Sequence, residues 1–319
     1  MLHPTKKPDE RGIALILALL ILTILVALIL DFDAEARREL RDATAFRDGL
    51  KASILARAGI QAARAVLRQD SQMEAKLQVH FDGPTDIWTF PLKDFPIGDG
   101  FVTATVEDER AKLNLNVLAN MPDPQSRLPT MLRYKRLFEM IQVDPRLVDA
   151  IVDWVDPDDT PQADGAESGY YQTLRPAYRA ANAPLQSLEE LLLVKGMTPE
   201  ALARIKKYVT VFPSQGDSKV NLNTADPLVM RALDPRISQS IAGEIVQGRP
   251  FKQMQDLDKL TSFEPIAKEL RLTQAYDVKS QYFGIRGTIR VNETVRAAEA
   301  VVRRDEAKGD TTLVYFRLQ

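Results

Sequence analysis

The residues best suited to chemistry are carboxylates that crowd one short stretch of the chain, residues 153–167. This stretch reads D-W-V-D-P-D-D-T-P-Q-A-D-G-A-E. Like charges a few ångströms apart repel by about 1 kcal/mol or more even in wet surroundings, so these acids must either spread into water or share a cation. Calcium fits the second case, because it binds roughly six to eight oxygens in irregular loops. The stretch therefore predicts a calcium-binding loop.

The spacing of these acids matches an EF-hand loop only in part. Counted from Asp156, Asp158 takes position 3 and Glu167 position 12, but Pro161 stands where the sharp EF-hand turn requires glycine. A solvated acidic loop is the alternative interpretation. Aromatic residues flank the acids and favour a loop that folds back on its domain: Trp154, Tyr170, Tyr171 and Tyr178. A bound ion would then serve as the core that so long a loop otherwise lacks.

Composition excludes several other functions. Lys and Arg number 42 against 44 Asp and Glu, so the chain offers no general attraction to nucleic acid. It has no cysteine and only two histidines, which excludes thiolate metal sites and leaves a hard cation bound by oxygen as the expected metal. Paired carboxylates can hydrolyse glycosides, but no serine elbow, phosphate loop or histidine accompanies these acids, so we expect no enzyme activity.

The N-terminal region contains an apolar run, residues 13–30, in which Thr23 is the one polar residue. As a helix this run is roughly 27 Å long, close to the hydrocarbon thickness of a bilayer. A cleaved secretory signal ending at Ala34-Glu35-Ala36 is the alternative, but its apolar core would be shorter and would not be followed by two aspartates. The run predicts a transmembrane segment, and basic residues on both sides leave its orientation open.

The segment after this run predicts a continuous helix that packs on a small antiparallel sheet. Helix breakers are scarce as far as Gln69, and apolar residues recur at every fourth position: Phe46, Leu50, Ile54, Ala58, Ala62 and Val66. We expect strands at 86–92, 100–108, 281–292, 294–304 and 311–319, with bulges at Gly284 and Gly287. The sheet would therefore be assembled from both ends of the chain.

The middle of the chain, residues 112–278, is rich in helical periodicity and contains an internal repeat. K-L-N-L-N at 112–116 recurs as K-V-N-L-N at 219–223, D-P-R at 144–146 recurs at 234–236, and the segment 184–193 matches 250–260. The carboxylate stretch has no counterpart in the second copy, so it is an insertion into one of two related helical units. Each unit resembles a helix-hairpin-helix or SAM-like element, with a turn at Gly196 and a new helix capped by Thr198.

In combination these features resemble the general secretion pathway protein K family, the minor pseudopilins of type II secretion systems. The resemblance rests on R-G-I-A-L-I-L-A-L-L at 11–20, V-E-D-E-R-A-K-L-N-L-N at 106–116, D-W-V-D-P-D-D-T-P at 153–161, G-A-E-S-G-Y-Y at 165–171, A-Y-R-A-A-N-A-P-L at 177–185 and V-N-L-N-T-A at 220–225. It implies cleavage by prepilin peptidase after Gly12 and methylation of Ile13. Most pilins and pseudopilins have glutamate where this chain has Leu17, and the loss of that buried acid implies the leading, tip position.

The resemblance implies an α+β pseudopilin fold with a large inserted α-helical domain. We expect a leader at 1–12, the transmembrane segment at 13–30, core parts at 31–111 and 279–319, and the insertion at 112–278, with units 112–212 and 219–278. Calcium would be bound by Asp156, Asp158, Asp159 and Glu167, with Asp153, Asp164 and Asn182 as further candidates. The implied partners are minor pseudopilins I and J, prepilin peptidase and the inner membrane, with the C-terminal domain in the periplasm. A DNA-handling pseudopilin of a competence system is the alternative function, although one glycine at the hairpin turn and no basic stripe argue against DNA binding.

Overall fold

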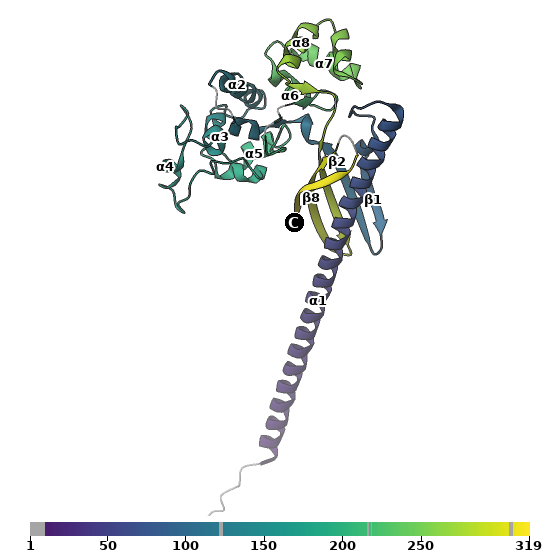
Figure 1. Ribbon diagram of the computed structural model, residues 1–319. Helices are drawn as coiled ribbons and strands as arrows, with labels where there is room; N and C mark the ends of the chain where they lie inside the picture. The colour runs from purple at the N-terminus through teal and green to yellow at the C-terminus, as the bar shows by residue number, and fades with distance from the viewer. Residues whose placement is uncertain (1–9, 121–123, 216, 218, 306–308) are drawn as a thin grey trace, which may run out of the picture.

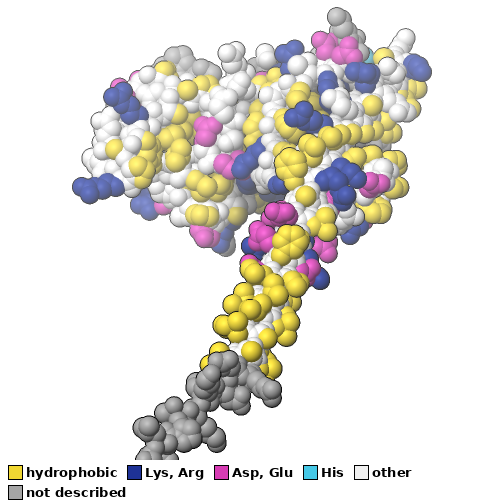
Figure 2. Space-filling model, turned by 90° about the horizontal axis from the view of Figure 1, so that it is seen from below, with side chains coloured by type: hydrophobic (Ala, Val, Ile, Leu, Met, Phe, Trp, Pro, Cys, Tyr) yellow, Lys and Arg dark blue, Asp and Glu magenta, His cyan; other side chains and the backbone are white. Residues whose placement is uncertain are grey.

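One long helix dominates the architecture of the protein. The computed structural model describes residues 10–120, 124–215, 217, 219–305 and 309–319, so most of the expected leader lies outside the described residues. Helix α1 (Glu10–Leu77) runs without a break for 68 residues (Figure 1). Its N-terminal half projects away from the body, and hydrophobic side chains cover it on the side seen in Figure 2. Within the described residues this helix is long and apolar enough to cross a membrane, with a mean hydropathy of 3.4 over its most apolar window and none of that window buried.

The C-terminal half of α1 packs on the sheet through small side chains. Ala52, Ala56, Ile60, Ala63 and Leu67 are buried at helical spacing, and the sheet side chains opposite them complete a hydrophobic core. Alanines allow a helix to lie close to a sheet, so Ala52, Ala56 and Ala63 form most of the contact face, together with Ile60 and Leu67.

The contact face expected from the sequence is therefore wrong. Phe46, Leu50 and Ile54 are 77%, 55% and 59% exposed, and Ala58 and Ala62 are exposed beside them. From Phe46 to Ala62 the expected residues form a second, uncovered stripe on the helix, whereas Val66 is partly buried and packs against the sheet core as expected. The uncovered residues were predicted to pack because apolar periodicity marks a face without showing what covers it.

The sheet consists of strands from both sides of the helical region, in the order β1-β2-β7-β8-β9. Each neighbouring pair is antiparallel. The strands are β1 (Leu92–Ile97), β2 (Gly100–Asp108), β7 (Tyr282–Val291), β8 (Thr294–Arg304) and β9 (Thr311–Leu318). Four of the five expected strands are confirmed within a residue or two. The assembly of one sheet from the two ends of the chain is confirmed as well.

Two local expectations for the sheet are wrong. Residues 86–92 do not form the first strand: a short 3-10 helix, η1 (Ile87–Thr89), comes there, and β1 begins at Leu92. Gly284 and Gly287 lie in unbroken register, whereas the register shifts fall between Leu92 and Phe95 and between Val301 and Val302. Glycine is required at position 284 by packing and not by a bulge, because a Cβ there would collide with the Glu109 carboxylate.

The chain between β2 and β7 forms the helical body, which lies beyond the end of the sheet that is farther from the apolar half of α1 (Figure 1). Its helices are α2 (Pro124–Met140), α3 (Leu147–Val155), α4 (Ser168–Tyr171), α5 (Pro199–Ile205), α6 (Pro227–Leu233), α7 (Gln239–Gly248) and α8 (Glu264–Leu272). Its 3-10 helices are η2 (Glu109–Ala111), η3 (Leu115–Asn120), η4 (Leu188–Leu193) and η5 (Met254–Lys259). A single hydrophobic cluster runs through this region.

The repeated K-x-N-L-N motif makes the same hydrogen bonds in both of its copies. Asn116, which is fully buried, donates through Nδ2 to the carbonyls of Leu185 (2.9 Å) and Val211 (2.8 Å) and accepts the Leu185 N–H (2.7 Å). Asn223 does the same in the second copy, with Phe251 and Val278. The two copies also each begin a short parallel pair, β3 (Leu113–Asn114) with β4 (Val209–Thr210), and β5 (Val220–Asn221) with β6 (Tyr276–Asp277).

Candidate metal centre

Helix α3 positions the first acids of the carboxylate loop. All of its residues are buried, because its apolar side chains belong to the core of the helical body. The helix ends at Val155, and the next residue, Asp156, has an extended backbone (φ −78°, ψ 157°) because a residue before proline disfavours the helical conformation. Pro157 therefore starts the loop immediately after a rigid element, and Asp156 is held at its edge.

Three of the expected ligands come together. Carboxylate oxygens of Asp156, Asp158 and Glu167 all lie within 4.8 Å of one another. Asp156 is 1% exposed and Glu167 is 7% exposed. Among the described residues, no hydrogen-bond donor reaches either carboxylate oxygen of Asp156 or of Glu167. Buried polar atoms almost always have a partner, so these oxygens are suited to bind a positively charged group.

The remaining expected ligands have other contacts. Asn182 has a left-handed backbone (φ 43°) and donates through Nδ2 to the Asp158 carbonyl (3.2 Å) and to Asp159 Oδ1 (3.3 Å), while its buried Oδ1 accepts no hydrogen bond within the described part of the chain. Asp153 is fully buried and accepts the Gln162 N–H (3.0 Å). Asp164 is exposed. Asn182 therefore contacts the loop of the three clustered acids and has a free side-chain oxygen among the described residues. The Asp153 carboxylate instead holds the loop by accepting the backbone N–H of Gln162.

Gly165 shows how closely the loop wraps around Asp153. A side chain at Gly165 would collide with the Asp153 carboxylate, so the loop can close over this acid only with glycine there. Lys195 fixes the same turn from outside, because its Nζ donates to the Gly165 carbonyl (2.8 Å). Tyr171 packs edge-on against Trp154 and stacks on Tyr178, at centroid distances of 5.1 Å and 5.2 Å. The expectation that aromatic residues fold the loop onto its domain is confirmed.

The electrostatics of the cluster follow from its burial. Burial, together with the neighbouring carboxylates, raises the pKa of Asp156 to about 6 and the pKa of Glu167 to about 7. A divalent cation would reverse this effect and hold both groups ionised. The donor set is carboxylate and amide oxygen, which suits calcium and does not suit zinc or copper. The residues present therefore fit a calcium ion.

Arg127 is also part of this site, although no pattern in the sequence indicated it. Arg127 comes from α2, and its guanidinium lies 3.6 Å from Asp156 Oδ2 and 4.0 Å from Asp158 Oδ2. Asp149 of α3 is likewise paired with Lys135 of α2, at 2.6 Å. Nothing in the local sequence of the loop indicates these partners, because α2 precedes the loop by a full helix and only the tertiary fold brings the two together.

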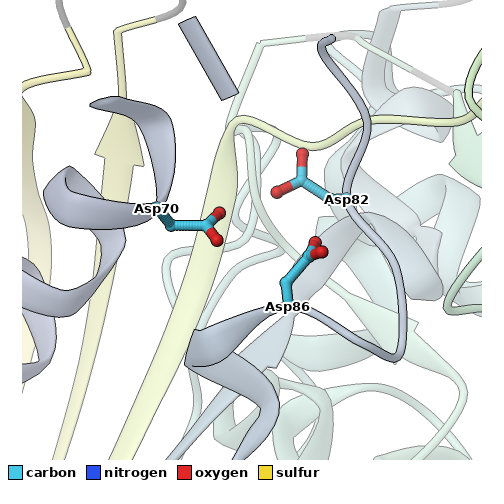
Figure 3. Close-up of side chains that lie close together, drawn as sticks. All are labelled: Asp70, Asp82 and Asp86. Carbon is cyan, nitrogen blue, oxygen red and sulfur yellow. The ribbon is translucent and has the colours of Figure 1, made fainter. Parts of the chain in front are cut away.

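A second group of acids was also missed, and it has a different character. Asp70 of α1 and Asp82 and Asp86 of the following segment point toward one another (Figure 3). Arg304, at the end of β8, pairs with two of these acids. Its Nη2 donates to both carboxylate oxygens of Asp82 (2.6 and 2.5 Å), and its Nη1 lies 3.4 Å from Asp70 Oδ2. Asp82 also accepts the Ser280 N–H (2.7 Å). This cluster is a buried ion-pair network that joins α1 to the sheet, rather than a cradle of unpartnered oxygens.

The fold defines a class of protein. A long helix with an apolar N-terminal half, packed by its second half on a small antiparallel sheet, is the pseudopilin arrangement. A chain of the solved GspK-GspI-GspJ complex from the enterotoxigenic Escherichia coli type 2 secretion system has the same fold, with a TM-score of 0.73 and 21% sequence identity over 86% of this chain and 97% of that one.

Sequence comparison identifies the family. Residues 111–214 and 220–279 match the two parts of the family described as type II secretion system (T2SS), protein K. The type II secretion system protein K of Klebsiella pneumoniae is 31% identical over 68% of this chain and 67% of its own length. That of Aeromonas hydrophila is 29% identical over 97% of this chain and 96% of its own length. The chain belongs to the type II secretion system protein K family and is a minor pseudopilin, a structural component of the secretion apparatus.

Proposed function

We propose that this minor pseudopilin occupies the tip of the type II secretion pseudopilus, where it initiates or caps the filament that drives protein export across the outer membrane. The observation that carries the proposal is the apolar helix. Leu17 is 57% exposed on a surface with no acidic residue from Ile13 to Leu30. A buried acid in such a helix is retained where a partner group meets it, so a subunit without the acid has no need of a subunit ahead of it.

The breadth of the molecule supports the same position. The helical body extends to one side of the line of α1 and beyond the end of the sheet (Figure 1). A further subunit stacked above would meet this body. The domain division expected from the sequence fits this arrangement: a pseudopilin core of residues 31–111 and 279–319, and an inserted helical domain of residues 112–278.

The apolar half of α1 supports a single-pass anchor in the inner membrane, with the body in the periplasm. Prepilin peptidase would cleave after Gly12 and leave Ile13 as the methylated N-terminus. Both residues are exposed near the N-terminal end of the helix, where an enzyme can reach them. The competence alternative is not favoured, because the relatives found by comparison are secretion proteins.

Minor pseudopilins I and J are the proposed partners. The solved complex with the same fold joins GspK to GspI and GspJ. On this chain, the uncovered stripe of Phe46, Leu50 and Ile54 is suited to the helix of a sibling subunit, because large apolar side chains at helical spacing need a helix of the same kind to cover them. The calcium loop would stabilise the helical body of the assembled tip.

A capture experiment with the full-length chain in detergent tests this proposal. Tagged wild-type protein should retain subunits I and J, and the triple variant Phe46→Ser, Leu50→Ser, Ile54→Ser should lose most of that binding. Leu272→Ser is the matched control, because Leu272 is 86% exposed on α8, which lies in the helical body beyond the end of the sheet (Figure 1). Equal capture by wild type and the triple variant would contradict the assigned surface, and no capture by wild type would contradict the assembly.

A further inference from the structure

Arg127 is the positive charge that the fold places beside the candidate calcium ligands. It lies in the first turns of α2, and its side chain is 22% exposed, so it is partly shielded from solvent. Its two guanidinium nitrogens approach two different acids, Asp156 at 3.6 Å and Asp158 at 4.0 Å. Among the described residues, Arg127 is the ion-pair partner of both acids.

The distances matter as much as the pairing. A charged hydrogen bond between nitrogen and carboxylate is roughly 2.7–2.9 Å long, so Arg127 stands back from both acids by about 1 Å. It therefore reduces the repulsion within the acid cluster without occupying the lone pairs of Asp156, whose oxygens accept no hydrogen bond from any described residue. Arg236 contrasts with it, because that residue makes close bonds to Asp234 and Glu269 at 2.8 Å and 2.6 Å.

A calcium ion at the same acids would lie a few ångströms from this guanidinium. Two positive groups then compete for the same negative charge. A double charge and a single charge about 5 Å apart repel enough to weaken binding by on the order of tenfold even when solvent screens them. When no ion is bound, the same arginine reduces the repulsion between the acids. It therefore stabilises the metal-free loop and destabilises the calcium-bound loop relative to it.

We propose that Arg127 is a built-in counter-ion that sets the calcium affinity of the loop: it stabilises the metal-free loop and weakens calcium binding. This inference rests on the proposed calcium site. Arg127 acts through Asp156 and Asp158 and is a positioning and tuning residue, with no place among the ligands. Its location on α2 also couples the loop to a helix that packs on both α3 and α6.

The test compares calcium affinity and thermal stability in full-length protein purified in detergent. Wild type, Arg127→Gln, Arg127→Lys and the control Arg236→Gln are stripped with chelator, and each is then titrated with calcium by calorimetry. Arg127→Gln should bind calcium about tenfold more tightly and melt at a lower temperature in chelator than wild type. Arg127→Lys should have a calcium affinity near that of wild type because it keeps the charge. The control Arg236→Gln removes a charge from the second unit and should leave the calcium affinity unchanged.

Several outcomes would overturn the inference. Unchanged or weaker binding by Arg127→Gln, with wild type still binding calcium, would refute the counter-ion role and leave the calcium site intact. Wild type that binds no calcium would refute both. If Arg127→Gln does not survive the chelator, the release of calcium from protein purified in calcium is timed with a fluorescent chelator. Slower release than from wild type supports the inference, and equal or faster release overturns it.

Discussion

At the scale of single residues, Asp153 in α3 and Asp156 directly after it have different roles in the loop. Both are buried, yet Asp153 accepts backbone N–H groups from its own loop, whereas the oxygens of Asp156 accept none from the described residues. A buried carboxylate that accepts backbone hydrogen bonds stabilises the loop conformation, whereas one without a donor is suited to bind a cation. Acid density alone could not separate these two roles, because the difference lies in where the loop backbone passes.

Glu167 provides the sharpest test of the metal centre. Glu167→Gln keeps the shape of the side chain but removes a buried charge that lacks a donor. In wild type, calcium at about 100 times its dissociation constant should add about 3 kcal/mol to the free energy of unfolding, so chelator should lower the melting temperature by several degrees. Glu167→Gln should lose most of this response, while its metal-free form melts no lower than metal-free wild type.

Asp164→Asn is the control for that measurement, because Asp164 is exposed and lies outside the clustered acids. It should keep the calcium response of wild type. A wild-type melting curve that is identical in calcium and in chelator would remove the metal centre altogether.

At the scale of elements, the repeated asparagine explains how two helical units stay closed. Each of Asn116 and Asn223 joins the start of its unit to two later segments through three buried hydrogen bonds. In the first unit one of those segments contains Leu185, three residues after Asn182. The motif that identifies the repeat in the sequence therefore also supports one side of the calcium loop.

Comparing replacements of the two asparagines distinguishes an effect on stability from an effect on calcium binding. Asn116→Ala and Asn223→Ala each leave buried backbone groups unpaired, and each should reduce the free energy of unfolding by about 3 kcal/mol. Asn116→Ala should in addition weaken calcium binding several-fold, because it loosens the segment next to Asn182, whereas Asn223→Ala should not. Urea unfolding and calcium titration of the two variants check this, and equal calcium affinities would show that the loop does not depend on Asn116.

At the scale of the whole molecule, the network around Arg304 holds the helix, the sheet and the entry to β7 together. Asp70 and Glu74 come from α1, Asp82 and Asp86 from the segment after it, and Arg304 from the end of β8. Burial raises the pKa of Asp70 to about 6 and the pKa of Glu74 to about 7. Several carboxyls thus share one arginine at the point where the helical body joins the core.

This network predicts a pH dependence of stability. Because the folded-state pKa of Glu74 lies above its unfolded value of 4.5, the folded chain holds more protons between these values, and stability is lost as the pH rises toward 7. Glu74→Gln should flatten this decline, since a neutral amide can still accept the Phe81 N–H. Thermal melts from pH 5 to 8 in saturating calcium check it. Glu293→Gln, an exposed change in the turn between β7 and β8, should leave the decline as in wild type.

Much of the architecture could be read from periodicity and motif order. The apolar run, the continuous helix, four of the five strands and the internal repeat are local patterns, and local patterns fix local structure. The start of β1 was missed because the β-prone residues Ile87, Trp88 and Phe90 lie in and directly after η1, ahead of the strand. The packing face of α1 was missed because alanine carries little hydrophobic signal, although its small size is what allows close contact.

The long apolar helix, the strands near both ends of the chain and the acidic insertion could be predicted from sequence alone, because each of these segments is encoded in contiguous residues, and their order resembles that of a pseudopilin. The folded structure was needed to show which acids converge, that Arg127 lies beside them, and that Arg304 pairs with Asp82 from a distant segment. Charge pairing acts over ångströms of space and not over sequence positions, so partners from distant segments become visible only when the chain has folded.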